Sequence, residues 1–193
     1  KHTSGDLAWL RAQGLDAAIA QHAKQGGAVL GICGGLQMLG QALIDPHGID
    51  GNASGLGLLP LVTVFETNKT VRHTQACFSA ALAACTASPF APLAGVAVSG
   101  YEIHHGQTQQ HAGMAQAGVV AHVALPNGLG WHNAQGYVLG VYVHGLFEDA
   151  AAVQALFGAG RAQPVPTLDS VFEGLADYVQ AHFESDVLDA LIR

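Results

Sequence analysis

Charge is scarce in this sequence, and basic charge is the scarcest. Only 11% of the 193 residues are charged, and 7 Lys and Arg against 14 Asp and Glu give a formal net charge of −7. A nucleic-acid-binding protein needs clustered Lys and Arg to neutralise phosphates, so we expect no nucleic-acid partner. With 50% hydrophobic residues, the composition is also the opposite of a disordered chain and predicts one globular domain.

Cysteines and long apolar runs are also few. The three cysteines, Cys33, Cys77 and Cys85, are odd in number and irregularly spaced, which argues against a disulfide framework or a zinc site. We therefore expect a reducing, cytoplasmic location. The most apolar stretch, residues 76–98, is interrupted by Ser, Thr and two prolines. A membrane helix needs about 18 or more uninterrupted apolar residues, so we expect no membrane span.

Two kinds of binding motif are missing as well. No phosphate-binding loop of the form Gly-x-x-x-x-Gly-Lys-Ser/Thr occurs, so the sequence assigns no nucleotide chemistry to this chain. The neighbouring His104 and His105 do not by themselves supply the three or four ligands of a metal site, and we expect no metal.

The clearest local pattern lies in residues 28–43. Residues 28–32 are apolar throughout, which is typical of a short strand buried on both faces of a parallel sheet. Leu36, Leu39 and Leu43 follow at i, i+3 and i+7, a spacing that predicts a helix with one apolar face. Because Cys33-Gly34-Gly35 separates the two, the sequence predicts a strand, a sharp turn and a helix in direct succession.

The remaining sequence predicts helices towards both ends and short strands between them. Helices are expected before Gly14, between Gly14 and Gly26, and over residues 149–157 and 168–191. The expected strands are residues 61–65, 71–78, 96–103, 119–125 and 138–143, with a hairpin turn at Pro126-Asn127-Gly128.

Cys33 stands where a nucleophile elbow places its reactive residue. Gly31-Ile32-Cys33-Gly34-Gly35 fits the small-x-nucleophile-x-small pattern, in which glycines leave room for a strained strand-to-helix turn. The following helix directs its free N–H groups at the sulfur, but its dipole contributes only about 0.3–1 kcal/mol. An imidazole is therefore needed to activate the thiol. The alternative is an inert core thiol, which is the favoured interpretation for Cys77 and Cys85.

Among the eleven histidines, His144 is the candidate base, because it ends the apolar strand at residues 138–143. Parallel-sheet proteins place reactive groups at strand ends, and imidazole suits a group that takes and returns a proton. The alternative is a histidine that only closes the strand. Glu148 and Asp149 follow closely and either orient His144 or cap the next helix.

A second polar cluster lies at Gly100-Tyr101-Glu102-Ile103-His104-His105-Gly106. Strand alternation places Tyr101, Ile103 and His105 on one face and Glu102 and His104 on the other. These polar side chains are candidates for lining a pocket.

Taken together, these residues resemble the class I, or triad, glutamine amidotransferases, and among them the cobyric acid synthase branch. The similarity extends over about the first 150 residues. The segments that carry it are Gly5 to Arg11, Gly31 to Gly40, Gly55 to Pro60, Gly100 to Gly106 and Tyr142 to Phe147. The cobyric acid synthase branch in particular is resembled by two segments in combination, Gly-Tyr-Glu-Ile-His at residues 100–104 and Val-His-Gly-Leu-Phe at residues 143–147.

The resemblance implies a flavodoxin-like, three-layer α/β fold with helices on both faces of a mostly parallel sheet, truncated at its N-terminus. One domain is implied over residues 1–193, with a core at 1–158 and a C-terminal helical segment at 167–192. It also implies hydrolysis of glutamine through a thioester on Cys33, with His144 as base, Glu148 as the nearest acid and the Gly34 N–H as oxyanion donor. Gln37, Tyr101, Glu102 and His104 are implied to bind the substrate.

The same resemblance implies partners outside this chain. Ammonia would pass to an N-terminal synthetase domain that uses ATP and magnesium to amidate a corrinoid, adenosylcobyrinic acid a,c-diamide, in cobalamin biosynthesis. No cofactor is expected in the present chain. An oxyanion donor from a Pro-Gly loop of the family would precede Lys1, so we expect the chain alone to be nearly inactive.

One departure from the class keeps other interpretations open. The class carries His-Pro-Glu, whereas this sequence has His144-Gly145-Leu146 with no acid two residues after the base. A Cys-His dyad is therefore as compatible with the sequence as a triad that uses Glu148. The alternatives are the amidotransferase domain of a cobyrinic acid a,c-diamide synthase, a docking domain that has lost catalysis, and a redox-sensing cysteine protein.

Overall fold

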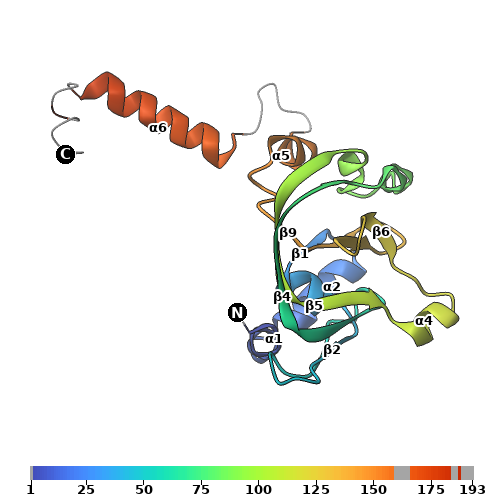
Figure 1. The fold of residues 1–193 in the computed structure, drawn as a ribbon. Helices are drawn as coiled ribbons and strands as arrows, with labels where there is room; N and C mark the ends of the chain where they lie inside the picture. Colours follow the sequence, from blue (N-terminus) through green and yellow to red (C-terminus); the bar gives the residue numbers. More distant parts are fainter. Residues whose placement is uncertain (1, 159–165, 184–186, 188–193) are drawn as a thin grey trace.

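The computed structural model describes residues 2–158, 166–183 and 187, and these form a mixed α/β structure with two sheets (Figure 1). The predicted α/β class is confirmed. The helices are α1 Thr3–Ala12, α2 Leu15–Lys24, α3 Gly34–Leu39, α4 Ala112–Gln116, α5 Ala150–Phe157 and α6 Leu168–His182, with 3-10 turns η1 Ala80–Ala84 and η2 Ala91–Leu93. The strands are β1 Val29–Ile32, β2 Ala42–Ile44, β3 Ala53–Ser54, β4 Leu61–Cys77, β5 Ala97–Gln110, β6 His122–Leu125, β7 Gly130–His132, β8 Val138–Val141 and β9 Val143–His144.

The four-stranded sheet has the order β1-β8-β7-β6. Its parallel pair β1/β8 aligns Val29 with Val138 and Ile32 with Val141, and both strands are apolar because both faces are covered. The β6/β7 hairpin turns at Asn127 and Gly128, whose φ angles are 57° and 73°, as the Pro-Asn-Gly sequence predicts.

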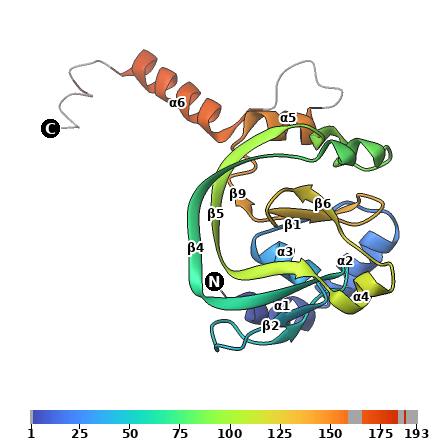
Figure 2. The ribbon, with the colours of Figure 1, turned by 45° about the vertical axis from the view of Figure 1, so that its right-hand side comes forward.

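The five-stranded sheet has the order β3-β2-β4-β5-β9 and is dominated by the long antiparallel pair β4/β5. In Figure 2 this pair forms a C-shaped arc whose concave side faces α3 and the four-stranded sheet. The short β9 adds to the edge of β5, where Tyr101 pairs with His144 and Glu102 with Val143. The arc therefore brings the middle of β5 to the region where β1 ends.

The strand pairing corrects the expected mostly parallel sheet. Among the described strands only β1/β8 and β2/β4 are parallel, and the other pairs are antiparallel. Tight turns can join antiparallel strands, whereas a parallel pair requires a longer crossover connection. Because the connections after residue 120 are short turns, neighbouring strands there pair antiparallel. The strands expected at 61–65 and 71–78 are one strand, β4, with a register shift between Phe65 and Thr70.

The turn between β1 and α3 is strained, as predicted for a nucleophile elbow. Cys33 has φ 54° and ψ −108°, and among the described non-glycine residues only Asn127 also has a positive φ. A Cβ atom on Gly31 would lie 2.6 Å from the backbone carbon of Gly35, so this close approach requires glycine. Such backbone strain costs about 1–3 kcal/mol and is typically found at functional sites.

The C-terminal helices differ in their packing. Asp149 caps α5 by accepting hydrogen bonds from the N–H groups of Ala151 and Ala152, so the capping alternative for this acid is confirmed. Helix α6 projects away from the rest of the chain and has no buried residue in the described structure (Figure 1). It covers the first part of the helix expected at 168–191, and residues 184–186 and 188–191 lie outside the described residues.

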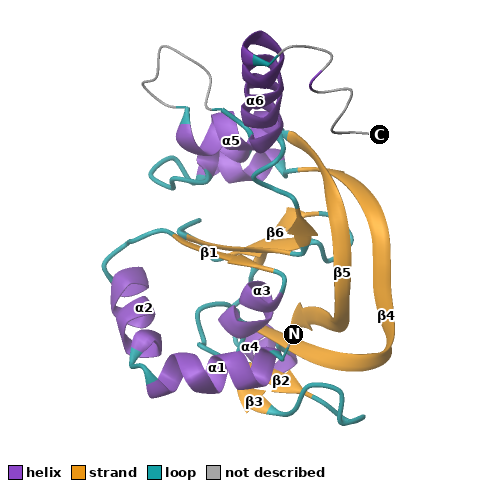
Figure 3. Cartoon of the chain, turned by 90° about the vertical axis from the view of Figure 1, so that its left-hand side faces the viewer, coloured by secondary structure: helices purple, strands orange, loops and turns teal. Residues whose placement is uncertain are grey.

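The main hydrophobic core lies between the four-stranded sheet, α3, α5 and the 3-10 turns. Helix α2 lies on the side of the molecule away from β4 and β5 (Figure 3) and has no buried residue. Within residues 2–158 and 166–183, no helix has the length and apolar character needed to cross a membrane.

Candidate active site

The parallel pair β1/β8 brings Cys33 and His144 to the same edge of the molecule. Cys33 follows β1 directly, and its N–H donates to the carbonyl of Val141 at the end of β8 (2.8 Å). After Tyr142, the chain continues into β9, which ends with His144. Because parallel strands end at the same edge of a sheet, two residues far apart in the sequence become neighbours in space.

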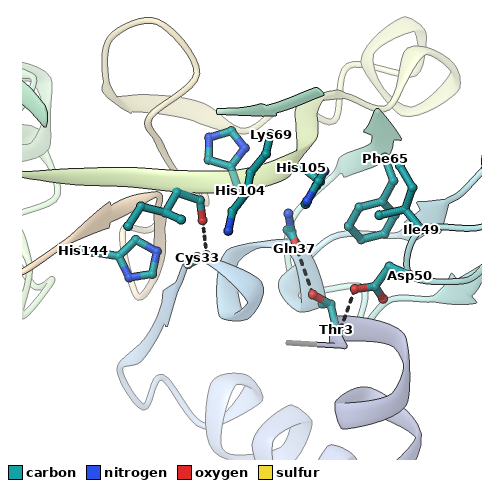
Figure 4. Close-up of a pocket in the computed structure, with 11 residues that line it drawn as sticks. Thr3, Cys33, Gln37, Ile49, Asp50, Phe65, Lys69, His104, His105 and His144 are labelled. Carbon is teal, nitrogen blue, oxygen red and sulfur yellow. Dashed lines mark hydrogen bonds between the residues drawn. The ribbon is translucent and has the colours of Figure 1, made fainter. Parts of the chain in front are cut away.

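Cys33 and His144 line one cavity of about 340 Å³ (Figure 4). In this view they lie at one end, and Thr3, Asp50 and Phe65 lie at the other. The complete lining among the described residues is Thr3, Cys33, Gln37, Ile49, Asp50, Phe65, Lys69, Ile103, His104, His105 and His144. The predicted nucleophile and the predicted base therefore share a cavity large enough to admit a small substrate.

The sulfur of Cys33 is sheltered but adjoins this cavity. The residue is 3% exposed, and its thiol donates a hydrogen bond to the carbonyl of Ile103 on β5 (3.4 Å). Gly34 and Gly35 open α3, and the first N–H groups of a helix have no intrahelical acceptor. The Gly34 N–H therefore lies at the open start of α3, directly after Cys33 in the chain.

Glu102 and His104 lie on the buried face of β5, as the alternation predicts, and they contact each other. The Glu102 carboxylate accepts from Nε2 of His104 (2.9 Å) and from Nε of Arg72 (2.5 Å). Nδ1 of His104 lies 2.6 Å from the carbonyl oxygen of Gly106, and its ring stacks on Tyr142 with centroids 3.8 Å apart. Of the two, only His104 lines the cavity, and Glu102 lies behind it.

Gln37 lines the cavity from α3 and is fixed by a buried hydrogen-bond chain. Its Oε1 accepts from the Thr3 hydroxyl (3.0 Å) and its Nε2 donates to the Tyr142 hydroxyl (3.2 Å). That hydroxyl is also 2.6 Å from the hydroxyl of Thr108. Burial raises the pKa of Tyr142 to about 12, so its hydroxyl stays protonated at neutral pH. The chain holds the Gln37 amide in one orientation.

Tyr101 and Glu148 are not brought to this cavity. Tyr101 is 54% exposed, on the opposite face of β5 from Glu102. Both residues line a second, smaller cavity of about 220 Å³ together with His73, Ser99 and Asp149. The Glu148 N–H donates to the carbonyl of Gly145 (2.8 Å), a turn that places its carboxylate against the backbone just after His144.

The sequence reasoning missed the far end of the cavity, which α1 and the loop after β2 form. Thr3 and Ser4 donate their N–H groups to the Asp50 carboxylate at 2.8 and 2.7 Å. The loop itself is organised by Asp45, whose carboxylate accepts from the N–H groups of His47, Asp50 and Gly51. Desolvation raises the pKa of Asp45, but these backbone donors outweigh it and hold the pKa well below its usual range.

Lys69 was missed as well. It lies where the β4/β5 register shifts, and it projects from β4 towards the cavity (Figure 4). Glu66 to Lys69 is a polar stretch that suggests a loop between two strands, so no sequence pattern indicated that Lys69 would line the cavity of Cys33. For metals, the described ranges hold no cluster of three or more His, Cys, Asp or Glu side chains suited to an ion.

Comparison with known proteins matches this arrangement to one family. Residues 1–152 match the CobB/CobQ-like glutamine amidotransferase domain. The chain belongs to this family.

Curated relatives of this amidotransferase domain are similar along its entire length. The chain is 65% identical over 192 residues to a cobyric acid synthase of Polaromonas sp. strain JS666, and 66% identical over 192 residues to one of Variovorax paradoxus. It is 55% identical over 199 residues to a cobyric acid synthase of Leptothrix cholodnii. Each match covers 100% of this chain but only 36%, 38% and 37% of the respective relative. The chain thus spans little more than a third of these proteins.

Proposed function

We propose that this domain hydrolyses glutamine to glutamate and ammonia, with Cys33 as the nucleophile. The observation that carries the proposal is the strained elbow at Cys33, which shares a cavity with His144. In a docking domain, a strained backbone at a buried cysteine would lower the stability of the fold and serve no purpose. In an enzyme, the same strained turn directs the nucleophile at the substrate cavity. Membership of the amidotransferase family supplies the substrate, a primary amide.

The reaction follows from the groups at this end of the cavity. His144 takes the proton from the Cys33 thiol, and the sulfur attacks the side-chain amide carbon of glutamine. The Gly34 N–H stabilises the oxyanion that develops on the amide oxygen. When the C–N bond breaks, His144 returns the proton and ammonia leaves, giving a γ-glutamyl thioester. Water, deprotonated by His144, then attacks the thioester, releasing glutamate and restoring the thiol.

Three further residues support this chemistry from fixed positions. Gln37 and His104 bind the substrate, because both line the cavity and both are held by hydrogen bonds to the protein. Glu102 acts through His104 rather than by contact. Glu148 orients His144 from the side away from Cys33, where its carboxylate adjoins Gly145. An orienting acid belongs behind the base, not in the substrate cavity. Tyr101 lines that same outer cavity and completes its wall.

The ammonia serves the remainder of a longer protein. Relatives named cobyric acid synthase are nearly three times the length of this chain. We infer that their remaining part is a synthetase domain that amidates adenosylcobyrinic acid a,c-diamide during cobalamin biosynthesis in the cytoplasm. ATP and magnesium act there. A cobyrinic acid a,c-diamide synthase would use the same glutaminase chemistry, and the corrinoid that the full-length protein amidates distinguishes the two.

Replacement of Cys33 in the full-length protein tests the proposal. With Cys33→Ala, amidation supported by glutamine should fall below detection, while amidation supported by free ammonia should continue at the parent rate. Cys77→Ala is the matched control, because Cys77 is exposed and distant in sequence from the elbow. If Cys33→Ala keeps glutamine-dependent amidation, the domain serves as a docking element and the proposal is wrong.

A further inference from the structure

One end of the cavity carries charge that the reaction at Cys33 does not require. The nucleophile and base lie at one end, whereas a carboxylate, Asp50, lies at the other, and an ammonium group, Lys69, faces the space between them (Figure 4). Bond cleavage in the amide needs a nucleophile, a proton carrier and an oxyanion donor. A separated anion and cation therefore point to recognition of the part of the substrate that does not react.

Asp50 is a preorganised anion. It is 9% exposed, and each carboxylate oxygen accepts one backbone N–H, from Thr3 and Ser4 at the start of α1. The Ser4 hydroxyl additionally donates to the Asp50 carbonyl (2.5 Å). A carboxylate oxygen has two lone pairs, so each retains acceptor capacity after these contacts. The position of the carboxylate is thus set by α1 and the Asp45 loop before any ligand arrives.

Lys69 is the complementary cation. It lies between Phe65 and Thr70, where the β4/β5 ladder is interrupted, so its side chain is freed from strand alternation and reaches the cavity. Within the part of the chain that the structure describes, no carboxylate forms an ion pair with its ammonium group. Histidines 104, 105 and 144 are the other titratable side chains of basic type in the described lining.

We propose that Asp50 binds the α-ammonium group and Lys69 binds the α-carboxylate of the amide substrate. The inference rests on the proposed glutaminase function and assigns two specificity-determining residues to it. Charge-assisted hydrogen bonds to the two charged groups on the α-carbon hold the zwitterion, and the side-chain amide then extends to Cys33. Simple amides and glutamine within a peptide lack one or both charges and are rejected. Lys69 and Asp50 therefore determine specificity rather than catalyse bond cleavage.

Steady-state hydrolysis by the full-length protein tests this with three substrates. These are glutamine, 5-amino-5-oxopentanoate, which lacks the α-ammonium group, and 4-aminobutanamide, which lacks the α-carboxylate. Loss of one charge-assisted contact should raise KM for glutamine by about 10- to 100-fold, with kcat nearly unchanged. Lys69→Met should raise KM for glutamine by this factor. Its KM for 4-aminobutanamide should equal that of the parent protein, because this substrate has no α-carboxylate for Lys69 to bind. Asp50→Asn should raise KM for glutamine by the same factor and leave KM for 5-amino-5-oxopentanoate unchanged, because that substrate has no α-ammonium group.

The controls separate recognition from folding and from chemistry. Lys69→Arg should retain a KM close to that of the parent, and Lys24→Met, which removes an exposed lysine at the end of α2, should change nothing. Because Asp50 also anchors α1, the Asp50→Asn protein is compared with its parent by thermal unfolding. If the Asp50→Asn protein does not fold, the inference is still tested by KM of the Lys69→Met and Lys69→Arg proteins and by the preference of the parent protein for glutamine over both analogues.

Two results would overturn the inference without touching the proposed function. One is a Lys69→Met protein that loses the same factor on all three substrates, which would place Lys69 at the reacting atoms or in the fold. The other is a parent protein that hydrolyses 4-aminobutanamide as well as glutamine. Failure of the glutaminase function itself looks different, because the parent would then hydrolyse none of the three.

Discussion

Strand β5 contributes residues to two cavities that differ in chemistry, an inner one at Cys33 and an outer one at Tyr101. On the inner side lie Cys33, His104 and His144, with polar groups held in chains of buried hydrogen bonds. On the outer side lie Tyr101, Glu148 and Asp149, more exposed and lining a smaller cavity. His104 lines the inner cavity and Tyr101, three residues earlier, lines the outer one, and the same holds for His144 and Glu148, four residues apart. Proximity in sequence therefore does not define the site.

The largest effect is expected for His144, which lines the inner cavity and directly precedes Gly145 of the outer one. His144→Asn removes the imidazole that we propose as the base but keeps a polar side chain of similar size. Glutamine hydrolysis should fall by about 10²- to 10⁴-fold, the usual contribution of a general base, with little change in KM. The measurement is kcat for glutamate release. A variant that retains parent kcat would mean that another group deprotonates Cys33.

An intermediate effect is expected for Glu148, on the outer side. Glu148→Gln keeps the shape of the side chain but removes its charge. If Glu148 orients His144 as we propose, kcat should fall by about 10- to 100-fold, because a Cys-His dyad remains. Asp149→Asn is the matched control, since it makes the same change one residue away and asparagine still caps α5. Equal kcat values for the two variants would favour a dyad without Glu148.

The smallest effect is expected for Tyr101, which is exposed and does not line the cavity that contains Cys33. Tyr101→Phe removes only a hydroxyl from the outer cavity, so kcat and KM for glutamine should stay within about twofold of the parent. The same assay measures both. A tenfold rise in KM would contradict the division between the two cavities and would restore Tyr101 as a substrate-binding residue.

The elbow at Cys33 and the position of His144 at a strand end were predictable from the sequence because local rules determine them. Glycines around Cys33 permit only a tight turn after an apolar strand, and His144 is marked by its place at the end of another such strand. Hydrophobic pattern and turn chemistry act over a few residues, and this is the range over which sequence reasoning succeeds. The hairpin turn at Asn127 and the helix cap at Asp149 are likewise determined by a few neighbouring residues.

The far end of the cavity was not accessible because long-range contacts create it. Asp50 reaches the cavity only because its carboxylate binds the start of α1, which lies more than forty positions earlier in the chain. Lys69 reaches it because β4 continues through a polar stretch that, by composition, ends a strand. The pairing partner β5 overrides local propensity there, as tertiary context commonly does in sheets.

Of the three cysteines, Cys33 alone should form a covalent bond with the γ-carbonyl carbon of glutamine. The direct test treats the full-length protein with a glutamine-derived electrophile, with and without excess glutamine, and locates the adduct by peptide mass spectrometry. We expect one adduct, on Cys33, that glutamine suppresses and Cys33→Ser abolishes. An adduct on Cys77 or Cys85 instead, or a Cys33 that ignores this reagent yet is reversibly oxidised by mild peroxide, would contradict the account.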